Sequence, residues 1–326
     1  MKTRLLFLLA FCCVINAFSQ TNDWYLLTKA TQINKIIPDN VNANELHLAT
    51  DIGYIKHNTS TNTVTDFLNL TSQDPAIGIV KDIALDPTSN NIALTIKNGI
   101  AIYNGINLLT YTYQDSDLTI GESTSQFRYL EVEYAQDGSL YIFKEDAFGY
   151  QIFNNGIFQT ETVTTFKPQD IIENNAGTKA YFAGANNGLW ELVKTTTTWN
   201  NYTASNSNLT NNFLTSFAVD SNDNLFIGHY LGLDRLEPNG TFTNCNATSP
   251  IAVFEISLSP TNDDILVRNS IPNSAYFEGL SVVDYNSCTW TNYKEDGVNC
   301  LDENVYSAVS FGGDGNIYGG QWTLSQ

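Results

Sequence analysis

The sequence predicts an all-β fold, a seven-bladed β-propeller of four-stranded antiparallel blades. Three observations predict it. Short apolar strands recur at a regular spacing, tight-turn residues separate them, and no helical periodicity of convincing length is present. The composition agrees, because Thr, Asn, Tyr, Phe and Ile are abundant and methionine occurs once in 326 residues.

The repeat becomes visible when the strand after each polar turn is taken as the reference. The first apolar residues of these strands are Leu46, Ile92, Leu140, Ala180, Leu225, Ile265 and Ile317. Their mean spacing of about 45 residues is typical of a propeller blade. An inner strand precedes each turn, as in VKDIALD, YLEVEYA and VFEISLS. The turns carry Asp-Gly, Asn-Asn or Asn-Asp, which tolerate the backbone conformation of a tight hairpin.

The first twenty residues predict a secretory signal peptide. Lys2 and Arg4 precede an apolar run from Leu5 to Ile15, which is too short to span a bilayer, and a small, polar exit follows. No later segment is long and apolar enough to cross a membrane. We therefore expect a signal peptide over 1–20, a single β-propeller domain over 21–326, and export to the periplasm, the cell surface or the medium.

The two ends of the mature chain predict how the ring closes. The last repeat, YSAVSFGGDGNIYGGQWTLSQ, has no outer strand, and the mature start, NDWYLLTK, resembles the missing one through Trp24 and Tyr25. An N-terminal strand in the seventh blade would remove the open sheet edges. The alternative is that the chain is a piece of a longer protein whose next segment finishes the blade.

Charge and cysteine content limit the partners. The chain has 15 Lys and Arg against 34 Asp and Glu, a net charge of −19, so nucleic acid is not an expected partner. Outside the signal peptide the cysteines are Cys245, Cys288 and Cys300. One pair could form a disulfide, and Cys288 with Cys300 is the most local choice. The spacing and the three histidines do not suggest a zinc or iron site, so no cofactor or metal is expected.

The segment NNFLTSFAVDSNDNLFIGHYLGLDRLE resembles the two-component-regulator propeller repeat. Phe226 takes the place of a tryptophan and His229 that of a threonine. The matching residues are Asp220, Asn224, Leu225, Phe226, Ile227, Gly228, Gly232 and Leu233. In that family the propellers are the ligand-sensing part of membrane-bound histidine kinases. The resemblance implies an exported propeller that recognises a ligand or partner, here without kinase or membrane segments.

Loops from all blades should meet on one rim of such a propeller, where binding residues concentrate. The candidate ligand-binding residues on the loops between second and third strands are Lys144, Asp146, Asn186, His229, Tyr230, Arg268 and Trp322. A solvated side chain is the alternative for His229 and for the charged loop at Lys144. We interpret Asp220 to Asn224 as a hairpin turn, because it lacks the central glycine and distant glutamate of a calcium loop.

No nucleophile motif is present, neither G-x-S-x-G, H-E-x-x-H nor a phosphate-binding loop. The leading hypothesis is an exported, non-enzymatic propeller that recognises a glycan, peptide or protein partner through one rim. The alternative is a propeller hydrolase, lyase or lactonase acting on carbohydrate-type substrates at the channel mouth. A purely structural surface component is a third possibility.

Overall fold

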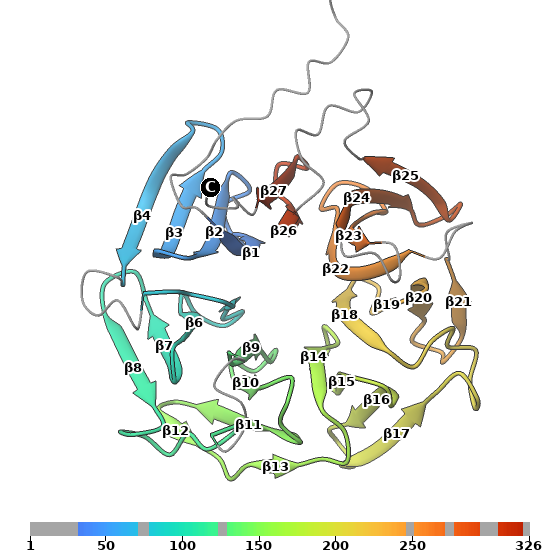
Figure 1. The fold of residues 1–326 in the computed structure, drawn as a ribbon, viewed down its shortest axis with the longest axis horizontal. Coiled ribbons are helices and arrows are strands. Elements are labelled where there is room, and N and C mark those ends of the chain that lie inside the picture. Colours follow the sequence, from blue (N-terminus) through green and yellow to red (C-terminus); the bar gives the residue numbers. More distant parts are fainter. Residues whose placement is uncertain are drawn as a thin grey trace, which may run out of the picture.

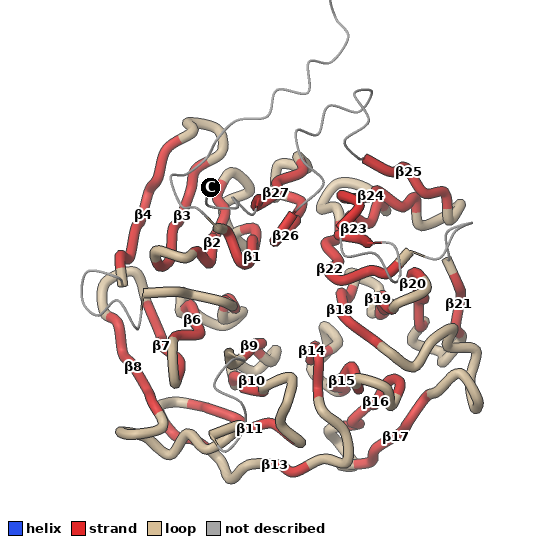
Figure 2. The backbone as a smooth tube through the Cα atoms, viewed as in Figure 1, coloured by secondary structure: helices blue, strands red, loops and turns tan. Residues whose placement is uncertain are grey.

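The computed structural model describes residues 32–70, 78–122, 129–245, 251–270, 277–293 and 306–321. Within these ranges the chain forms strands β1 to β27 and no helix. The strands build seven antiparallel sheets around a common centre, and each sheet runs outward in chain order (Figure 1). Where the described residues are continuous, turns and loops, drawn in tan, connect consecutive strands (Figure 2). The all-β propeller predicted by the repeat is therefore confirmed.

Blades 1 to 3 occupy the N-terminal half of the chain. Blade 1 contains β1 (Ile33–Pro38), β2 (Glu45–Thr50), β3 (Gly53–Asn58) and β4 (Thr63–Asn69). Blade 2 contains β5 (Ile83–Leu85), β6 (Ile92–Ile96), β7 (Gly99–Tyr103) and β8 (Leu108–Thr112). Blade 3 contains β9 (Glu131–Tyr134), β10 (Leu140–Phe143), β11 (Gly149–Asn154), β12 (Ile157–Phe158) and β13 (Thr162–Val163). Its outer strand is split, because β12 and β13 both pair with β11.

Blades 4 to 6 follow the same plan. Blade 4 contains β14 (Pro168–Glu173), β15 (Lys179–Gly184), β16 (Gly188–Val193) and β17 (Thr198–Tyr202). Blade 5 contains β18 (Leu214–Val219), β19 (Leu225–His229), β20 (Gly232–Leu236) and β21 (Phe242–Asn244). Blade 6 contains β22 (Ala252–Leu258), β23 (Asp264–Ser270), β24 (Phe277–Asp284) and β25 (Thr289–Tyr293).

The seventh sheet has two strands, β26 (Tyr306–Phe311) and β27 (Ile317–Gln321), and lies between blades 6 and 1 (Figure 1). The described residues therefore form six complete blades, not the seven that the repeat predicts. The segment with Trp24 and Tyr25, which we expected to complete the last blade, lies outside the described residues. The seven reference strands of the repeat are all present, as β2, β6, β10, β15, β19, β23 and β27.

Packing between blades explains why the second strands are mostly apolar. Each sheet is covered on both faces, so a strand such as β6, IALTI, is buried at every position. The cluster between blades 3 and 4 contains Tyr141, Phe143 and Phe182, with Trp190 and Trp199 packed against it. Aromatic side chains at these strand positions therefore hold neighbouring blades together.

A disulfide joins Cys245, just after β21, to Cys288, between β24 and β25, with a Cα–Cα distance of 5.1 Å. The most local pairing in the sequence, Cys288 with Cys300, is therefore wrong, because Cys288 is bonded across the boundary between blades 5 and 6. Sequence proximity misses this pair because it becomes close only when the two blades stack. Cys300 lies outside the described residues.

The turn from Asp220 to Asn224 is a hairpin turn, as interpreted from its sequence. The backbone N–H groups of Asn222 and Asn224 donate to Asp220 Oδ1 at 2.8 and 2.9 Å. Asp223 occupies the left-handed region with φ of 62°. Within the described ranges, no helix is long and apolar enough to cross a membrane.

A β-bulge recurs near the start of five inner strands, those of blades 1, 4, 5 and 6 and of the seventh sheet. A bulge adds one residue and redirects the side chains around it. Three bulged residues reach the next sheet. Asn34 Nδ2 donates to Val80 O at 2.6 Å, and the hydroxyls of Thr215 and Ser307 donate to the Val253 and Ile33 carbonyls.

Candidate functional site

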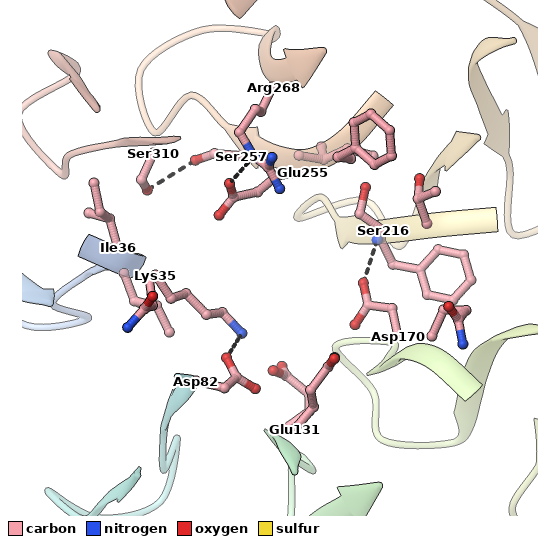
Figure 3. Close-up of a pocket in the computed structure, with 18 of the residues that line it drawn as sticks. Lys35, Ile36, Asp82, Glu131, Asp170, Ser216, Glu255, Ser257, Arg268 and Ser310 are labelled. Atoms are coloured by element: carbon pink, nitrogen blue, oxygen red, sulfur yellow. Dashed lines mark hydrogen bonds and ion pairs between the residues drawn. The ribbon is translucent and has the colours of Figure 1, made fainter. Parts of the chain in front are cut away.

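A cavity of about 560 Å³ lies at the centre of the ring. Its walls are mainly the inner strands, β1, β9, β14, β18, β22 and β26, together with residues preceding β5 and β9 (Figure 3). Inner strands are sheet edges, paired on one side only in the strand order of each sheet. The cavity is therefore surrounded by backbone edges and by the side chains that the inner strands direct toward the centre.

One position recurs in all seven sheets, in the inner strand or, for blade 2, just before it, and each time it directly precedes a residue that packs between sheets. We call these residues the inner ring: Lys35, Asp82, Glu131, Asp170, Ser216, Glu255 and Ala308. The residue after each is apolar, such as Ile83, Val132 and Ile171, which are at most 1% exposed. All members except Ala308 line the cavity. The repeat thus places ionisable groups from different blades around one centre.

Three inner-ring carboxylates each accept a hydrogen bond from a backbone N–H of the next sheet. The Val132 N–H donates to Asp82 Oδ2 at 2.8 Å. The Phe217 N–H donates to Asp170 Oδ2 at 2.6 Å, and the Val309 N–H donates to Glu255 Oε2 at 3.1 Å. These carboxylates belong to blades 2, 4 and 6. Hydrogen bonds to a charged acceptor are the stronger kind, so the same groups that line the cavity also connect the sheets.

Two cationic side chains pair with this ring. Lys35 Nζ lies 2.6 Å from Asp82 Oδ1, and Arg268 Nε donates to Glu255 Oε2 at 3.1 Å (Figure 3). Lys35 extends from β1 toward blades 2 and 3, whereas Arg268 extends from β23 over its own inner strand. These two cations thus pair with carboxylates of blades 2 and 6, and Lys81 is a third cation in the cavity lining.

Burial and charge crowding shift the pKa values of this group. Burial raises the pKa of Glu133 to about 8, with Lys35 opposing the rise and Asp170 and Asp82 adding to it. Burial likewise raises the pKa of Asp170 to about 7, and Lys35 again opposes it. Burial lowers the pKa of Lys35, but Asp82, Glu133 and Asp170 together raise it above its ordinary value. Burial is the largest cause of both raised pKa values, and the charge of Lys35 offsets it only in part.

Aromatic and amide groups also line the cavity. Lys81 Nζ lies 5.5 Å from the centre of the Tyr129 ring, and Arg268 lies 5.8 Å from that of Phe254. Asn34 and Gln169 add amides to the lining. Flat aromatic rings beside hydrogen-bonding side chains form the kind of surface on which amphipathic ligands bind.

Arg268 is the one member of the predicted site that lines the cavity, counting only the described residues. Its position was misassigned, because β23 continues to Ser270 and Arg268 lies within the strand rather than in a loop. Tyr230 lies next to this region. Its ring packs against those of Phe213 and Phe254, with ring centroids 4.3 and 5.8 Å apart. Tyr230 therefore contacts Phe254, one of the residues that line the cavity.

His229 ends β19 and is fully buried, contrary to the expected rim position. The Leu231 N–H donates to His229 Nδ1 at 3.1 Å, and Nε2 lies 3.3 Å from Asp234 Oδ1. Nδ1 thus accepts a backbone hydrogen bond, while Nε2 faces Asp234 without a hydrogen-bond partner among the described residues. The observed contacts of His229 are therefore those of a residue that fixes the turn after β19.

The remaining predicted residues are spread over separate places. Lys144 is buried in the turn after β10, where Nζ donates to Gly121 O at 3.2 Å and lies 4.0 Å from Asp146 Oδ1. Asn186 is exposed in the turn between β15 and β16. Trp322 lies outside the described residues. A ligand-binding role for the seven predicted residues stays a prediction.

The cavity residues that the sequence prediction missed are Lys35, Asp82, Glu131, Glu133, Asp170 and Glu255. A signal for them was present in the repeat. In most inner strands an ionisable residue directly precedes an apolar one, as in Lys35-Ile36, Asp82-Ile83 and Glu255-Ile256. The prediction aligned the second strands and searched the loops, so this column of charges went unnoticed.

Among the described residues, no group of three or more His, Cys, Asp or Glu side chains is arranged to hold a metal ion. The cavity carboxylates come from different blades and are partly engaged with backbone N–H groups and cations.

Comparison with known proteins gives no match to a protein-family model and none to a curated protein sequence. Solved structures with a similar fold include extracellular domains of putative hybrid two-component systems from B. thetaiotaomicron. The BT4673 domain has a TM-score of 0.62 and 15% identity, covering 92% of this chain and 38% of that chain. The BT3049 domain has a TM-score of 0.65 and 17% identity, covering 90% and 39%.

Virginiamycin B lyase from Staphylococcus aureus is also similar, with a TM-score of 0.64, 13% identity and coverage of 91% of this chain and 97% of that chain. At these identities the similarity establishes the fold and no activity. This chain spans about two fifths of the two-component domains, in agreement with the 38% and 39% coverage. The resemblance to two-component-regulator propellers is thus confirmed at the level of the fold.

Proposed function

We propose that this protein is an exported recognition propeller that binds a saccharide in the central cavity. The observation that carries the proposal is the composition of the cavity wall. Two aromatic rings, Tyr129 and Phe254, stand among amides and carboxylates from several blades. Sugar rings present apolar C–H faces and many hydroxyls, so they match a site that combines flat apolar surfaces with hydrogen-bonding groups.

The size of the cavity supports a short saccharide. About 560 Å³ lies within the range of small-molecule sites, which measure roughly 300–1,000 Å³. The walls are also rigid, because the inner-ring carboxylates that face the cavity are hydrogen-bonded to neighbouring sheets. A preorganised wall reduces the entropy lost on binding.

Export and the closed seven-bladed ring are parts of the same proposal. The signal-peptide pattern of residues 1–20 supports export. The seventh sheet supports seven blades, because β26 packs against both β22 and β1 in the position of an inner strand. The proposed complement to β26 and β27 is the mature N-terminal segment.

The proposal is tested by isothermal titration of residues 21–326 with a panel of neutral and charged oligosaccharides. We expect Tyr129→Ala and Phe254→Ala each to weaken binding by roughly tenfold, since stacked aromatic contacts contribute on the order of 1 kcal/mol or more. Phe67→Ala is the matched control, because Phe67 is 45% exposed on the outer strand β4.

Failure of every saccharide to bind would contradict the proposal. So would binding that loses as much affinity in Phe67→Ala as in the two cavity variants. Product formation during the titration, followed by chromatography, would favour the carbohydrate-active alternative instead of simple recognition.

A further inference from the structure

We propose that Phe148 and Lys167 form an outer subsite, which binds the part of a saccharide chain that extends out of the central cavity between blades 3 and 4. This inference rests on the proposed saccharide-binding function and names the ligand as an oligosaccharide longer than the cavity. Phe148 lies in the turn between β10 and β11, and Lys167 directly precedes β14. Neither residue lines the cavity itself.

The outer subsite lies at the end of the ring where the aromatic cavity residues lie. In blade 3, Phe143 at the end of β10 pairs with Glu131 at the start of β9. The turn that carries Phe148 is therefore at the same end of the sheet as Tyr129, which precedes β9. In blade 6 the start of β22 likewise pairs with the end of β23, which places Phe254 at the corresponding end. Because every sheet runs outward in chain order around the ring, these ends face the same way (Figure 1).

The outer subsite adjoins the cavity wall. Glu145 and Gln169 both line the cavity, and Gln169 Nε2 donates a hydrogen bond to the Glu145 carbonyl at 3.2 Å. Glu145 belongs to the turn that carries Phe148, and Gln169 belongs to the strand that Lys167 precedes. A chain that leaves the cavity over this contact therefore reaches the Phe148 ring next.

Phe148 and Lys167 combine an apolar surface with hydrogen-bond donors. Phe148 is 52% exposed, and Lys167 Nζ lies 4.9 Å from the centre of its ring. A sugar ring can pack its apolar C–H face against the aromatic ring, while its hydroxyls accept hydrogen bonds from the ammonium group, which carries three N–H donors. The pair therefore matches a saccharide better than it matches a purely apolar ligand.

Two similar pairs belong to the cavity wall, which supports assigning Phe148 to the same ligand. Lys81 Nζ lies 5.5 Å from the centre of the Tyr129 ring, and the Arg268 guanidinium lies 5.8 Å from that of Phe254. Counting only the described residues, three of four cation–aromatic contacts thus lie at this end of the ring. A lone exposed aromatic residue needs no explanation, but Phe148 repeats a pairing that the cavity wall contains twice.

Backbone contacts hold both residues of the outer subsite in place. The Thr164 N–H donates to the Phe148 carbonyl at 3.4 Å, and the Ala185 N–H donates to the Lys167 carbonyl at 3.3 Å. Pro168 follows Lys167 and begins β14. A subsite that is fixed before the ligand binds loses less entropy on binding, so a single aromatic ring can contribute measurably to affinity.

The experiment measures how affinity depends on chain length. Cello-, malto- and xylo-oligosaccharides from dimer to hexamer are titrated calorimetrically into the protein used for the saccharide panel. In the series that binds, we expect the hexamer to bind about tenfold more tightly than the dimer, because only the longer chain reaches the outer subsite. Phe148→Ala should lower the affinity for the hexamer about fivefold and leave that for the dimer unchanged. Phe148→Tyr keeps an aromatic ring and should retain the gain.

Two further variants separate the outer subsite from the cavity. Tyr129→Ala should weaken binding of the dimer and the hexamer alike, because Tyr129 lines the cavity. Leu231→Ala is the matched control, since Leu231 is 38% exposed in the turn between β19 and β20, at the same end of the ring but in blade 5. It should leave both affinities unchanged. Circular dichroism checks that each variant folds.

Equal affinity for dimer and hexamer in the unmodified protein would overturn the outer subsite and leave saccharide binding in the cavity standing. An equal loss for both lengths in Phe148→Ala would also overturn it, because Phe148 would then act through the cavity. Loss of the chain-length gain in Leu231→Ala, with Phe148→Ala unaffected, would place the emerging chain over blade 5 instead. Failure of every oligosaccharide to bind would reject the inference together with the proposed function.

Discussion

Lys35 and Asp82 form a 2.6 Å ion pair between the inner strand of blade 1 and the residue preceding the inner strand of blade 2. The same Asp82 accepts a hydrogen bond from the Val132 N–H of blade 3. One carboxylate thus connects three consecutive blades at the centre of the ring. Loss of its charge should therefore affect the stability of the ring as well as the cavity.

We expect Asp82→Ala to lower the free energy of unfolding by about 2–4 kcal/mol, because it leaves a backbone N–H and a half-buried ammonium without their acceptor. Asp82→Asn, which keeps one acceptor oxygen, should cost less. Urea denaturation of both variants measures the difference. Equal losses in the two variants would show that the hydrogen bond to Val132 contributes little.

The raised pKa values of Glu133 and Asp170 predict a stability that falls as the pH rises. Their folded pKa values of about 8 and about 7 exceed the ordinary values of 4.5 and 3.8, so the folded state holds protons that the unfolded chain releases. The stability that these two carboxyl groups contribute is fully present below about pH 4 and is lost as the pH rises to about 8. Its slope is at most about 1.4 kcal/mol per pH unit for each group.

Glu133→Gln should flatten this dependence and raise stability near pH 8 relative to the unmodified protein, while the two proteins differ little near pH 5. Urea unfolding at both pH values provides the comparison. A pH slope that is unchanged in Glu133→Gln would contradict the assigned pKa shift.

The disulfide between Cys245 and Cys288 should stabilise the junction of blades 5 and 6. It spans 43 residues of sequence, and disulfides typically contribute about 2–4 kcal/mol, with the upper end expected for a loop of this length. We expect Cys288→Ser to lose this amount, measured by denaturation under oxidising conditions. Cys300→Ser is the comparison. Mass mapping without reduction should find Cys245 linked to Cys288, and a linkage to Cys300 would contradict the observed pairing.

His229→Ala should lower stability and leave saccharide affinity unchanged. The side chain is fully buried and its ring nitrogens face the Leu231 N–H and Asp234. Removing it leaves a buried carboxylate without this neighbour, so we expect a loss of about 1–3 kcal/mol. Thermal denaturation and calorimetry on the same sample separate the two effects. Weaker binding with unchanged stability would restore His229 as a ligand contact.

The sequence was sufficient for the fold because the repeat is enforced by packing. Strands such as IALTI and GIAIY are buried at nearly every position, and similar apolar runs mark the second strands of the other blades. The same repeat did not predict the number of complete blades: it indicated seven, and the described residues form six. The segment that we expected to complete the last sheet lies outside the described residues.

The site was harder to predict because a residue belongs to it when its side chain points toward the cavity. Whether the residue lies in a strand or in a loop does not decide this. Arg268 looked like a loop residue, but the strand β23 extends past it. His229 lies at a sequence position where we expected a rim contact. Its side chain is instead buried, with its ring nitrogens facing Asp234 and the Leu231 N–H. Asp170 lies within a strand, and a bulge turns it toward the centre.

The unequal members of the inner ring have a consequence for recognition. A ring of identical side chains would offer a bound molecule several equivalent orientations. In the inner ring, blade 1 contributes the cation Lys35, whereas blades 3 and 4 contribute the carboxylates Glu131 and Asp170. The electric field of these charged side chains therefore points across the axis of the ring and not along it. A molecule with an uneven charge distribution therefore has one preferred rotational setting in the channel.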